Sequence, residues 1–414
     1  MQRPVTMALV WFFCLAGLGT FFPFFSMYLH ENAGLSGTQV GVILAILPLV
    51  GIFAQPLWGQ LADRTGLRSR VLALIALSAA LGYAALALPR SFATLALATA
   101  GLALFSMALL PMNVSVTLAL ARNAGPHAFG LTRVWGTVGF LVAVVSVPPL
   151  LDAWQAAEGL THDPSDPEPG MRATFLVTAA LTAVGGAIAL ALPRKGAVAL
   201  RAPRGDWRRL FRHGPYLRVL VFVLLSFVFL QGPMTFFPVF VRSLGGTLDS
   251  VSRLWVPMLL LEIPLIALSG LGLQRLGARG LLAIGVFAGG LRWLVCGLAP
   301  DLGWVYPVQL LHGVVVTGLI LGGPLYVEQV VPERLRSTGQ GVLAMMGVSI
   351  GGIASNLATG WLIDHVGASA PYVIGGIGGI ALGLLLPLLL PRPQRPPPEP
   401  DEAPPPAATT PAGR

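Results

Sequence analysis

An uninterrupted apolar stretch opens the chain. Residues 5–29 read VTMALVWFFCLAGLGTFFPFFSMYL and include no charged side chain. About twenty such residues cross roughly 30 Å of hydrocarbon as an α-helix. The stretch is longer than a secretory signal and lacks a small-residue cleavage site. It therefore predicts a first membrane span, and similar stretches follow it along the 414 residues.

The composition supports the same interpretation for the whole chain. Hydrophobic residues make up 55% of it and charged residues only 10%, against roughly 25% charged residues in an average soluble domain. We expect an all-α polytopic membrane protein of about twelve transmembrane helices in two pseudo-symmetric six-helix bundles. The expected helices lie near 5–29, 38–61, 71–89, 92–120, 130–151, 172–192, 217–241, 252–273, 280–299, 303–327, 339–362 and 371–390.

Changes in composition divide the chain into four segments. A basic, proline-containing cytoplasmic linker at 193–216 separates an N-terminal bundle (1–192) from a C-terminal bundle (217–390). The tail at 391–414 is so rich in proline that we expect it to be a disordered cytoplasmic extension. The acidic loop near 152–171 carries no visible chemistry.

Basic residues gather on alternate connections. One side of the membrane is expected to carry Arg64, Arg68, Arg70, Arg122, Arg194, Lys195, Arg201, Arg204, Arg208, Arg209, Arg212, Arg275, Arg279, Arg334 and Arg336, and the other mainly Arg90, Arg172, Arg242 and Arg253. The positive-inside rule then places both termini in the cytoplasm and the protein in the cytoplasmic (inner) membrane. Because the net charge of +9 lies at span ends, we expect the lipid bilayer, and no nucleic acid, as its partner.

An internal repeat supports two halves. Residues 20–25 read TFFPFF and residues 235–240 read TFFPVF, each late in the opening helix of a half. Repeated halves predict a central solute site between them. We expect the polar pairs at the outer span ends, His30-Glu31 and Asp364-His365, to be solvated caps.

The loop after the second expected helix carries a family signature. Residues 59–68, GQLADRTGLR, resemble the G-x-x-x-D-R-x-G-x-R loop of the major facilitator superfamily. The resemblance implies alternating access between two bundles, with this loop as a gating latch that stabilises one access state. The gating residues are Gly59, Asp63, Arg64, Gly66 and Arg68. The second-half copy at 272–279 has Gln274 in place of the acid, so only the first copy is expected to act as a charged latch.

A narrower resemblance is to the permease branch that contains the lactose and phenylpropionate proton symporters. It rests on FGLTRVWGTVGF at 129–140, on Trp255 followed by Glu262 and Pro264, on LRW at 291–293 and on QLLH at 309–312. The matches fall in the order and on the helices that this branch requires.

Departures limit what the resemblance implies. The fourth expected helix has no carboxylate to partner Arg133, and Val315 stands where the lactose permease has a coupling acid. A lactose mechanism therefore cannot be copied onto this chain. The G-x-x-x-G-P-x-x-G-G antiporter motif of many drug exporters is also missing from the fifth helix, which demotes drug efflux.

Four ionisable residues are expected well inside the hydrocarbon: Arg133, Glu262, Arg292 and His312. Each charge at the centre of a helix costs about 2.5–3.5 kcal/mol on insertion scales, so such residues indicate a functional cavity. The alternative is a structural pair in which Glu262 and Arg292 neutralise each other beside His312. Such a pair gains little stability over apolar residues, because desolvation offsets the Coulomb attraction.

These residues receive distinct roles. Glu262, His312 and Arg292 are predicted to couple protons, with Glu262 taking up a proton when Arg292 is drawn away. Arg133 and Arg292 are predicted to hold the substrate. Two guanidiniums face one carboxylate, which leaves an excess of positive charge for an organic anion to balance, and a guanidinium can bind such an anion bidentately. Sugar hydroxyls are the competing ligand. Further substrate-binding candidates are Gln309, Asn113 and Asn356, although buried amides often only join helices.

The predicted function is secondary active transport. Lys195 is the only lysine and no P-loop carries it, which excludes an ATP-driven pump in one polypeptide. We expect a monomeric, non-enzymatic proton symporter of a small organic solute, an aromatic or other organic acid or a sugar, with no cofactor and no metal. The alternatives are a proton-coupled exporter of drugs or metabolites and a transport-inactive membrane receptor or scaffold.

Overall fold

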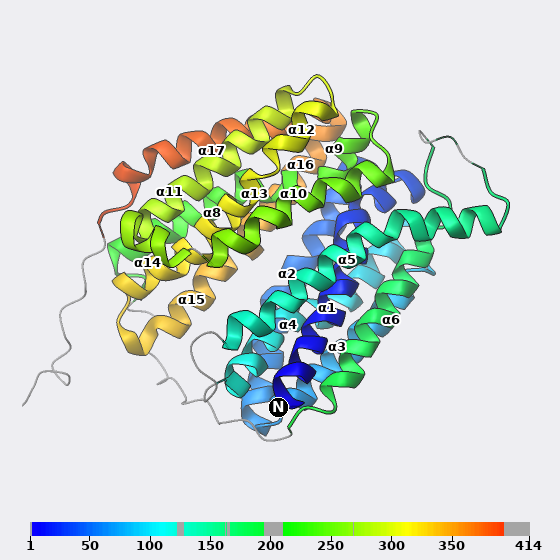
Figure 1. Ribbon diagram of the computed structural model, residues 1–414. Helices are drawn as coiled ribbons and strands as arrows, with labels where there is room; N and C mark the ends of the chain where they lie inside the picture. The colour runs from blue at the N-terminus through cyan, green and yellow to red at the C-terminus, as the bar shows by residue number, and fades with distance from the viewer. Residues whose placement is uncertain are drawn as a thin grey trace, which may run out of the picture.

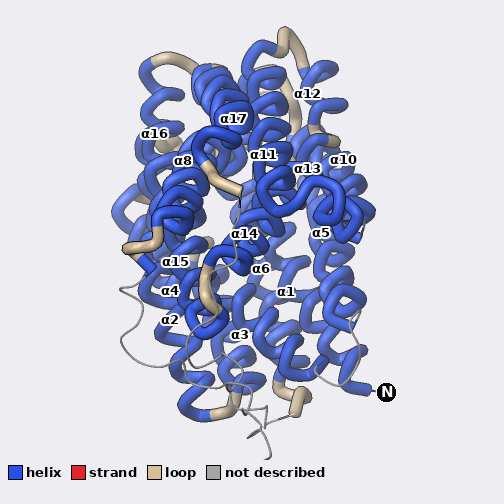
Figure 2. Tube along the Cα trace, turned by 90° about the vertical axis from the view of Figure 1, so that its left-hand side faces the viewer, coloured by secondary structure: helices blue, strands red, loops and turns tan. Residues whose placement is uncertain are grey.

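The computed structural model describes residues 2–121, 128–161, 163, 166–193, 210–267 and 269–392. Helices account for the secondary structure of these residues, and none of them lies in a β-strand (Figure 2). The all-α prediction is confirmed. Figure 1 shows two bundles, α1–α6 and α8–α17, that lie close together near α9 and α16 and diverge toward α15 and the N terminus. The predicted tail lies outside the described residues from 393 onward, as does most of the predicted linker.

The first half consists of long helices. They are α1 (Gln2–Met27), the π-helical turn η1 (Tyr28–Asn32), α2 (Gly37–Thr65), α3 (Arg68–Ala85), α4 (Phe92–Ala121), α5 (Ala128–Ala157) and α6 (Met171–Ala189). Sequence signals fix the ends of α2: Ser36 and Gln39 form a capping box at its start. Gly66 ends α2 in the left-handed region with φ 66°, a conformation that glycine adopts without steric cost.

The second half is more broken. Its opening and middle helices are α8 (Gly214–Thr235), α9 (Phe237–Ser243), α10 (Leu248–Ala267), α11 (Ser269–Leu298), α12 (Leu302–Val308) and α13 (Leu311–Val316). After these come η2 (Thr317–Leu321), α14 (Gly322–Val330), η3 (Glu333–Leu335), α15 (Arg336–Ala344), η4 (Met345–Gly351), α16 (Gly352–His365) and α17 (Ala370–Leu389). Both η2 and η4 are π-helical and lie within spans that were predicted as single helices.

The repeated TFFP segment takes two shapes. Pro23 lies inside the continuous α1, whereas the helix breaks at Phe236 (φ −92°, ψ 4°) and resumes as α9 with Pro238 in its first turn. A proline in the first helical turn lacks only an N–H that would have no partner there. The same TFFP sequence therefore lies in a continuous helix in one half and at a helix break in the other.

Eleven helices of the described chain are long and apolar enough to cross a membrane. The predicted span at 252–273 corresponds to α10, which ends at Ala267 and contains Pro257 and Pro264. The predicted connection at 274–279 corresponds to a kink at the non-helical Gly277 (φ 67°, ψ 173°), where two helical stretches of α11 meet. Highly exposed leucines such as Leu81 (74%), Leu97 (75%) and Leu388 (79%) cover the outer surface, as expected for helices that face lipid.

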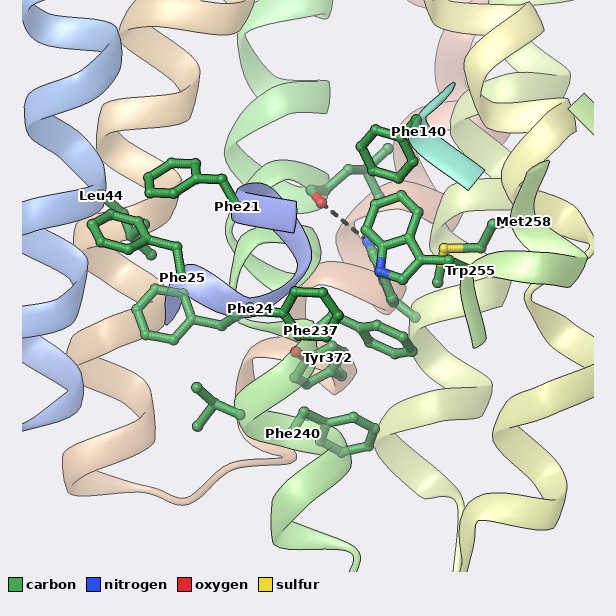
Figure 3. Close-up of a cluster of buried hydrophobic side chains, with 14 of the residues drawn as sticks. Phe21, Phe24, Phe25, Leu44, Phe140, Phe237, Phe240, Trp255, Met258 and Tyr372 are labelled. Atoms are coloured by element: carbon green, nitrogen blue, oxygen red, sulfur yellow. Dashed lines mark hydrogen bonds between the residues drawn. The ribbon is translucent and has the colours of Figure 1, made fainter. Parts of the chain in front are cut away.

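An aromatic core fills the region where the halves meet (Figure 3). Phe21 stacks on Phe25 at 4.4 Å, and Phe240 lies 4.1 Å from Tyr372 between ring centroids. Aromatic pairs of this kind stabilise by about 0.5–1.5 kcal/mol beyond the area that they bury. The rings come from both copies of the repeated segment, so the repeat supplies the central packing of each half.

Two helix pairs form the largest contacts between the halves. The start of α2 packs on the end of α16, where Gly37 and Gly41 face Gly360 and Asn356 so closely that a Cβ on either of these two α2 glycines would meet backbone atoms. The second pair is α5 with α10, where the Ser252 hydroxyl donates to the Val144 carbonyl at 2.7 Å. The interdomain hydrogen bonds among the described residues lie at or near the end of the molecule that carries Arg242, which we call the Arg242 end. The opposite end, which carries the loop at Asp63, is called the Asp63 end.

Candidate functional site: a charged cluster between the halves

Three helices of the second half bring polar side chains together. Arg292 of α11 is buried and donates from Nε to Gln309 Oε1 at 2.8 Å. Its Nη1 lies 3.1 Å from His312 Nδ1. Because a guanidinium only donates, Nδ1 accepts and the ring proton of a neutral His312 lies on Nε2. Arg292 therefore fixes the tautomer of the histidine.

The other nitrogen of His312 faces the carboxylate of α10. Nε2 lies 3.9 Å from Glu262 Oε2, which is longer than a hydrogen bond, so a small shift or a bound group is needed to join them. The alternative of a direct Glu262–Arg292 pair is not what the structure shows. Both side chains are described, no ion pair joins them, and His312 lies between them.

Apolar and sulfur atoms cover the remaining faces of Arg292. Its guanidinium carbon lies 4.0 Å from the ring centroid of Trp293, and its nitrogens lie 3.5 Å and 3.6 Å from the sulfurs of Met258 and Met234. Aromatic faces attract guanidinium groups, more strongly where water is excluded. No carboxylate contacts this buried charge in the described part of the chain, so neutral donors, acceptors and ring faces stabilise it.

Glu262 instead responds to the first half. The positive charge of Arg133 on α5 acts on the Glu262 carboxylate across the interface. Arg133 is only half-buried, whereas Glu262 and Arg292 are buried. The predicted set Arg133, Glu262, His312 and Arg292 is thus brought together, and it runs from one half into the other.

An aromatic layer lies next to the charges. Trp255 packs against Phe140 at 5.0 Å and Phe22 at 5.9 Å between ring centroids, both from the first half. Its indole also lies 6.3 Å from the His312 ring, measured between ring centroids. Phe140 follows Arg133 by seven residues and Glu262 follows Trp255 by seven, which is two helical turns in each case.

The α5–α10 contact is therefore an antiparallel ladder. From the Arg242 end inward, Ser252 bonds to Val144 and Trp255 packs on Phe140, and beyond them the charge of Arg133 acts on Glu262. The two charged residues therefore lie furthest from the Arg242 end, and the contact of Trp255 with Phe140 lies between them and that end.

The three predicted amides lie in different places. Gln309 belongs to the cluster, because it accepts from Arg292 and donates from Nε2 to the Val305 carbonyl at 2.9 Å. Asn113 is buried inside the first half beside Cys14. Asn356 accepts from the Thr235 hydroxyl at 2.6 Å. The side chains of Asn113 and Asn356 make these contacts within one half, whereas the backbone of Asn356 faces Gly41 of the other half. A substrate role for the two amides stays a prediction.

The gating loop lies at the Asp63 end. Asp63 forms an ion pair with Arg68 at 2.8 Å inside the same loop, and Arg64 is exposed. Gly66 supplies the left-handed turn between the two charged residues. A cavity of about 110 Å³ is lined by Gln55, Gly59, Ala62, Asp63, Ala108, Pro111, Met112 and Ser115. A latch between the halves stays a prediction.

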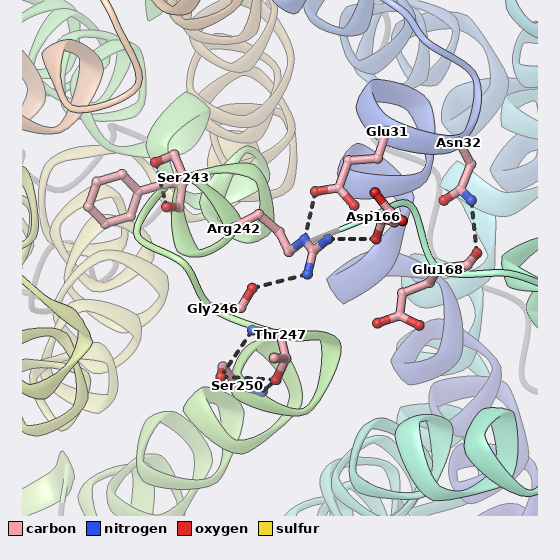
Figure 4. Close-up of polar contacts among 10 residues, drawn as sticks. Glu31, Asn32, Asp166, Glu168, Arg242, Ser243, Gly246, Thr247 and Ser250 are labelled. Carbon is pink, nitrogen blue, oxygen red and sulfur yellow. Dashed lines mark hydrogen bonds and ion pairs between the residues drawn. The ribbon is translucent and has the colours of Figure 1, made fainter. Parts of the chain in front are cut away.

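The polar contacts at the Arg242 end were not predicted from the sequence (Figure 4). Glu31 pairs with Arg242 at 2.7 Å, and Asp364 binds the start of α2. The interpretation of Glu31 and Asp364 as solvated caps is wrong, because both side chains bind the opposite half. One signal was available: the two copies of the repeat are followed by opposite charges, Glu31 in one half and Arg242 in the other.

The arrangement defines a class of protein. Two helical bundles that enclose buried charges at their interface, in a chain with lipid-facing leucines, are those of a multi-pass membrane transporter. Comparison with known proteins places it more closely. The family model described as "MFS_1 like family" matches residues 5–374. The chain belongs to this family, within the major facilitator superfamily.

Individual relatives cover most of the chain. It is 29% identical to the maltose permease of Geobacillus stearothermophilus, over 95% of this chain and 96% of that one. It is 27% identical to a probable 3-phenylpropionic acid transporter of Escherichia coli (strain K12), over 75% and 79%. Among solved structures, the nucleoside transporter NupG superposes with a TM-score of 0.78 at 18% identity, over 94% and 99%. The chain is thus a secondary transporter of small solutes and not an enzyme.

Proposed function

We propose that this protein is a proton-coupled importer of a sugar in the cytoplasmic membrane, working by alternating access. The observation that carries the proposal is the set Arg133, Glu262, His312 and Arg292, which crosses the interface between the halves. Such buried charges are costly in a membrane, and proton relays are a common reason for them.

Coupling follows from the position of Glu262. The positive charge of Arg133, which belongs to the other half, acts on this carboxylate. When the halves move apart at this level, or when Arg133 turns to a substrate, the carboxylate loses its partner and is expected to take up a proton. A proton and a substrate that both favour the same state are then linked, because each shifts the equilibrium by its differential affinity.

A neutral, hydroxyl-rich solute fits the cluster better than an anion does. Gln309, His312 and the covering rings already engage Arg292, and Arg133 interacts electrostatically with Glu262. Sugar hydroxyls both donate and accept, so they can bridge a guanidinium and a carboxylate. The aromatic layer of Phe22, Phe140 and Trp255 offers apolar faces to a ring. The relationship to a maltose permease supports the same class.

An organic acid is the second candidate. Two guanidiniums face one carboxylate in the cluster, so protonation of Glu262 leaves an excess of positive charge that an anion would balance. The relationship to a probable 3-phenylpropionic acid transporter favours this alternative. Export of a metabolite through the same cluster would need only the opposite gradient.

The basic residues support an orientation. The Asp63 end carries Arg64, Arg68 and Arg70, so the positive-inside rule supports this end, with both termini, in the cytoplasm. In that orientation the contacts at the Arg242 end close the outer side, and the structure represents an inward-facing state.

Uptake into proteoliposomes tests the proposal. With an imposed inward proton gradient, the protein is expected to accumulate radiolabelled maltose, and unlabelled 3-phenylpropionate should not compete. Glu262→Gln should retain maltose exchange but lose uphill accumulation. Arg133→Lys should weaken binding on the order of tenfold, because an ammonium cannot reproduce the bidentate fork.

The control is Glu328→Gln, since Glu328 is an exposed glutamate of α14 outside the cluster. It should accumulate solute like the unaltered protein. Accumulation by Glu262→Gln at the unaltered level would refute the coupling role. Transport blocked by 3-phenylpropionate and not by maltose would replace the sugar with the organic acid.

A further inference from the structure

The connection between α1 and α2 is bound by the second half at both of its ends. It comprises residues 28–38 and lies at the Arg242 end. Arg242 of α9 contacts the connection near its beginning, at Glu31. Asp364 of α16 contacts it at its end, at Gly37 and Thr38. These two contacts come from helices that are more than a hundred residues apart in the chain.

The first contact is a shielded ion pair with additional bonds. Arg242 Nε donates to Glu31 Oε1 at 2.7 Å, with side-chain exposures of only 7% and 15%. Its Nη2 donates to the Asp166 carbonyl at 2.9 Å, in the loop between α5 and α6, and its Nη1 donates to Gly246 at 3.1 Å (Figure 4). Asn32 holds the same loop by donating to the Glu168 carbonyl at 2.9 Å. One arginine of the second half thus binds two segments of the first.

The second contact is a helix cap that crosses between the halves. Asp364 Oδ1 accepts from the Gly37 N–H at 2.6 Å, and Oδ2 accepts from the Thr38 N–H at 2.7 Å and the Thr38 hydroxyl at 2.6 Å. A carboxylate at a helix N-terminus satisfies free N–H groups and interacts favourably with the helix dipole.

The position of Asp364 on its own helix strengthens this interpretation. It is the next-to-last residue of α16, where the negative end of the dipole disfavours an acid. The carboxylate gains a favourable partner only from α2. Its placement therefore serves the contact between the halves and not the stability of α16.

Release of Asp364 leaves α2 intact. Ser36 Oγ still accepts from the Gln39 N–H, and Gln39 Oε1 still accepts from the Ser36 N–H at 3.1 Å. The Gly37 and Thr38 amides and the Thr38 hydroxyl pass to water when the contact opens. A contact that opens without unravelling its helix can form and break repeatedly.

We propose that Arg242 and Asp364 form an interdomain clasp on the α1–α2 connection, and that release of the clasp is required before the site opens at the Arg242 end. The clasp consists of Glu31, Arg242, Asp364 and the N-terminus of α2. These residues set the equilibrium between the two access states and take no part in binding the solute.

Distance measurements on the full chain in nanodiscs test the clasp. Spin labels are placed at Glu158→Cys in the first half and Ser369→Cys in the second, two exposed positions at this end. Both native cysteines are buried, so the added sites label selectively. Asp364→Asn and Arg242→Gln are each expected to raise the ratio of the long-distance to the short-distance population on the order of tenfold. The reason is that each substitution removes charge-assisted hydrogen bonds.

The matched control is Arg253→Gln, whose ion pair with Asp249 lies within α10 and joins no other helix. It should leave the distances unchanged. If Arg242→Gln does not fold, Glu31→Gln tests the same contact, and the charge swap of Glu31 and Arg242 should restore the closed population. Unchanged distances in Asp364→Asn and Arg242→Gln, or an equal shift in the control, would overturn the proposal. The readout needs neither solute nor proton gradient, so it is independent of the proposed function.

Discussion

The two halves share one design but differ in continuity. In the first half, each predicted span is a single α-helix apart from the π-helical turn η1 that follows α1, with 30 residues in both α4 and α5. In the second half, the corresponding spans are divided: α8 bends into α9, and π-helical turns interrupt the tenth and eleventh spans. Three of the four charged-cluster residues, Glu262, Arg292 and His312, belong to this broken half.

The difference indicates a division of labour. Continuous helices give the first half a firm surface that presents one charge, Arg133. Interruptions in a membrane helix free backbone groups, which are tolerated where protein surrounds them, and π-helical turns often lie at functional sites. The second half therefore carries most of the charged cluster on interrupted helices, whose backbone conformation can change more readily than that of continuous helices. Each prediction below tests this comparison, beginning with the largest expected effect.

Replacing Arg292 with lysine should abolish most transport while the chain still folds. Lysine keeps the charge but cannot donate to Gln309 and His312 together, so the histidine loses its fixed tautomer. Charge-assisted hydrogen bonds contribute about 1.5–3 kcal/mol, which predicts a decrease in uptake on the order of tenfold to a hundredfold. Initial uptake rates measure this, with the exposed Arg253→Lys as control. Equal rates for the two variants would place the chemistry outside the second half.

The break in the tenth span depends on a close helix approach. A Cβ on Gly318 of η2 would meet the backbone of Gly285 on α11. Gly318→Ala should therefore cost about 1–3 kcal/mol in overpacking and lower the thermal midpoint in detergent. Gly101→Ala, in the first half, has no atom within 4 Å of its new Cβ and should be neutral. A neutral Gly318→Ala would mean that the two halves tolerate change alike.

The aromatic layer should affect affinity more than rate. Trp255→Phe keeps a ring beside Phe140 and Phe22 but loses contact area, at a cost of about 0.5–1.5 kcal/mol. The apparent KM for uptake should rise by about twofold to tenfold with a smaller change in maximal rate. Phe211→Leu, outside the aromatic layer, is the comparison. A change in maximal rate alone would assign Trp255 to gating.

The smallest expected effect is at the gating loop. Asp63→Asn removes the ion pair with Arg68, in which the Asp63 side chain is 57% exposed. Exposed ion pairs contribute only about 0–1 kcal/mol to stability. Transport should slow by no more than a few fold while solute binding is retained. Binding by thermal shift and uptake by vesicles separate the two effects. Lost binding would contradict a gating role.

Much of this architecture was predictable because lipid imposes simple rules. Apolar length gave the spans, and charge inside them gave the cluster residues. Their pairing was not predictable, since Glu262 was expected to be balanced by Arg292 on a neighbouring helix and responds instead to Arg133 of the other half. Such pairing depends on how the two bundles pack against each other, and no periodic pattern in a single sequence predicts that packing.

The missed features share the same physical cause. Glu31 and Arg242 are 211 residues apart, and each alone is an ordinary polar residue at a span end. The π-helical turns were missed because η2 and η4 are as apolar as the helices around them. Hydropathy records the length of a span but not an extra residue in one of its turns.

The π-helical turn η2 has a consequence for how the second half could change over time. A π turn holds an additional residue, so the side chains beyond it are rotated by about 100° relative to an unbroken α-helix. Deleting one residue between Thr317 and Leu321 would restore the α-helix and turn a different set of α14 side chains toward α8 and α11, the helices that α14 packs against. A single codon lost there would therefore repack the interior of the second half.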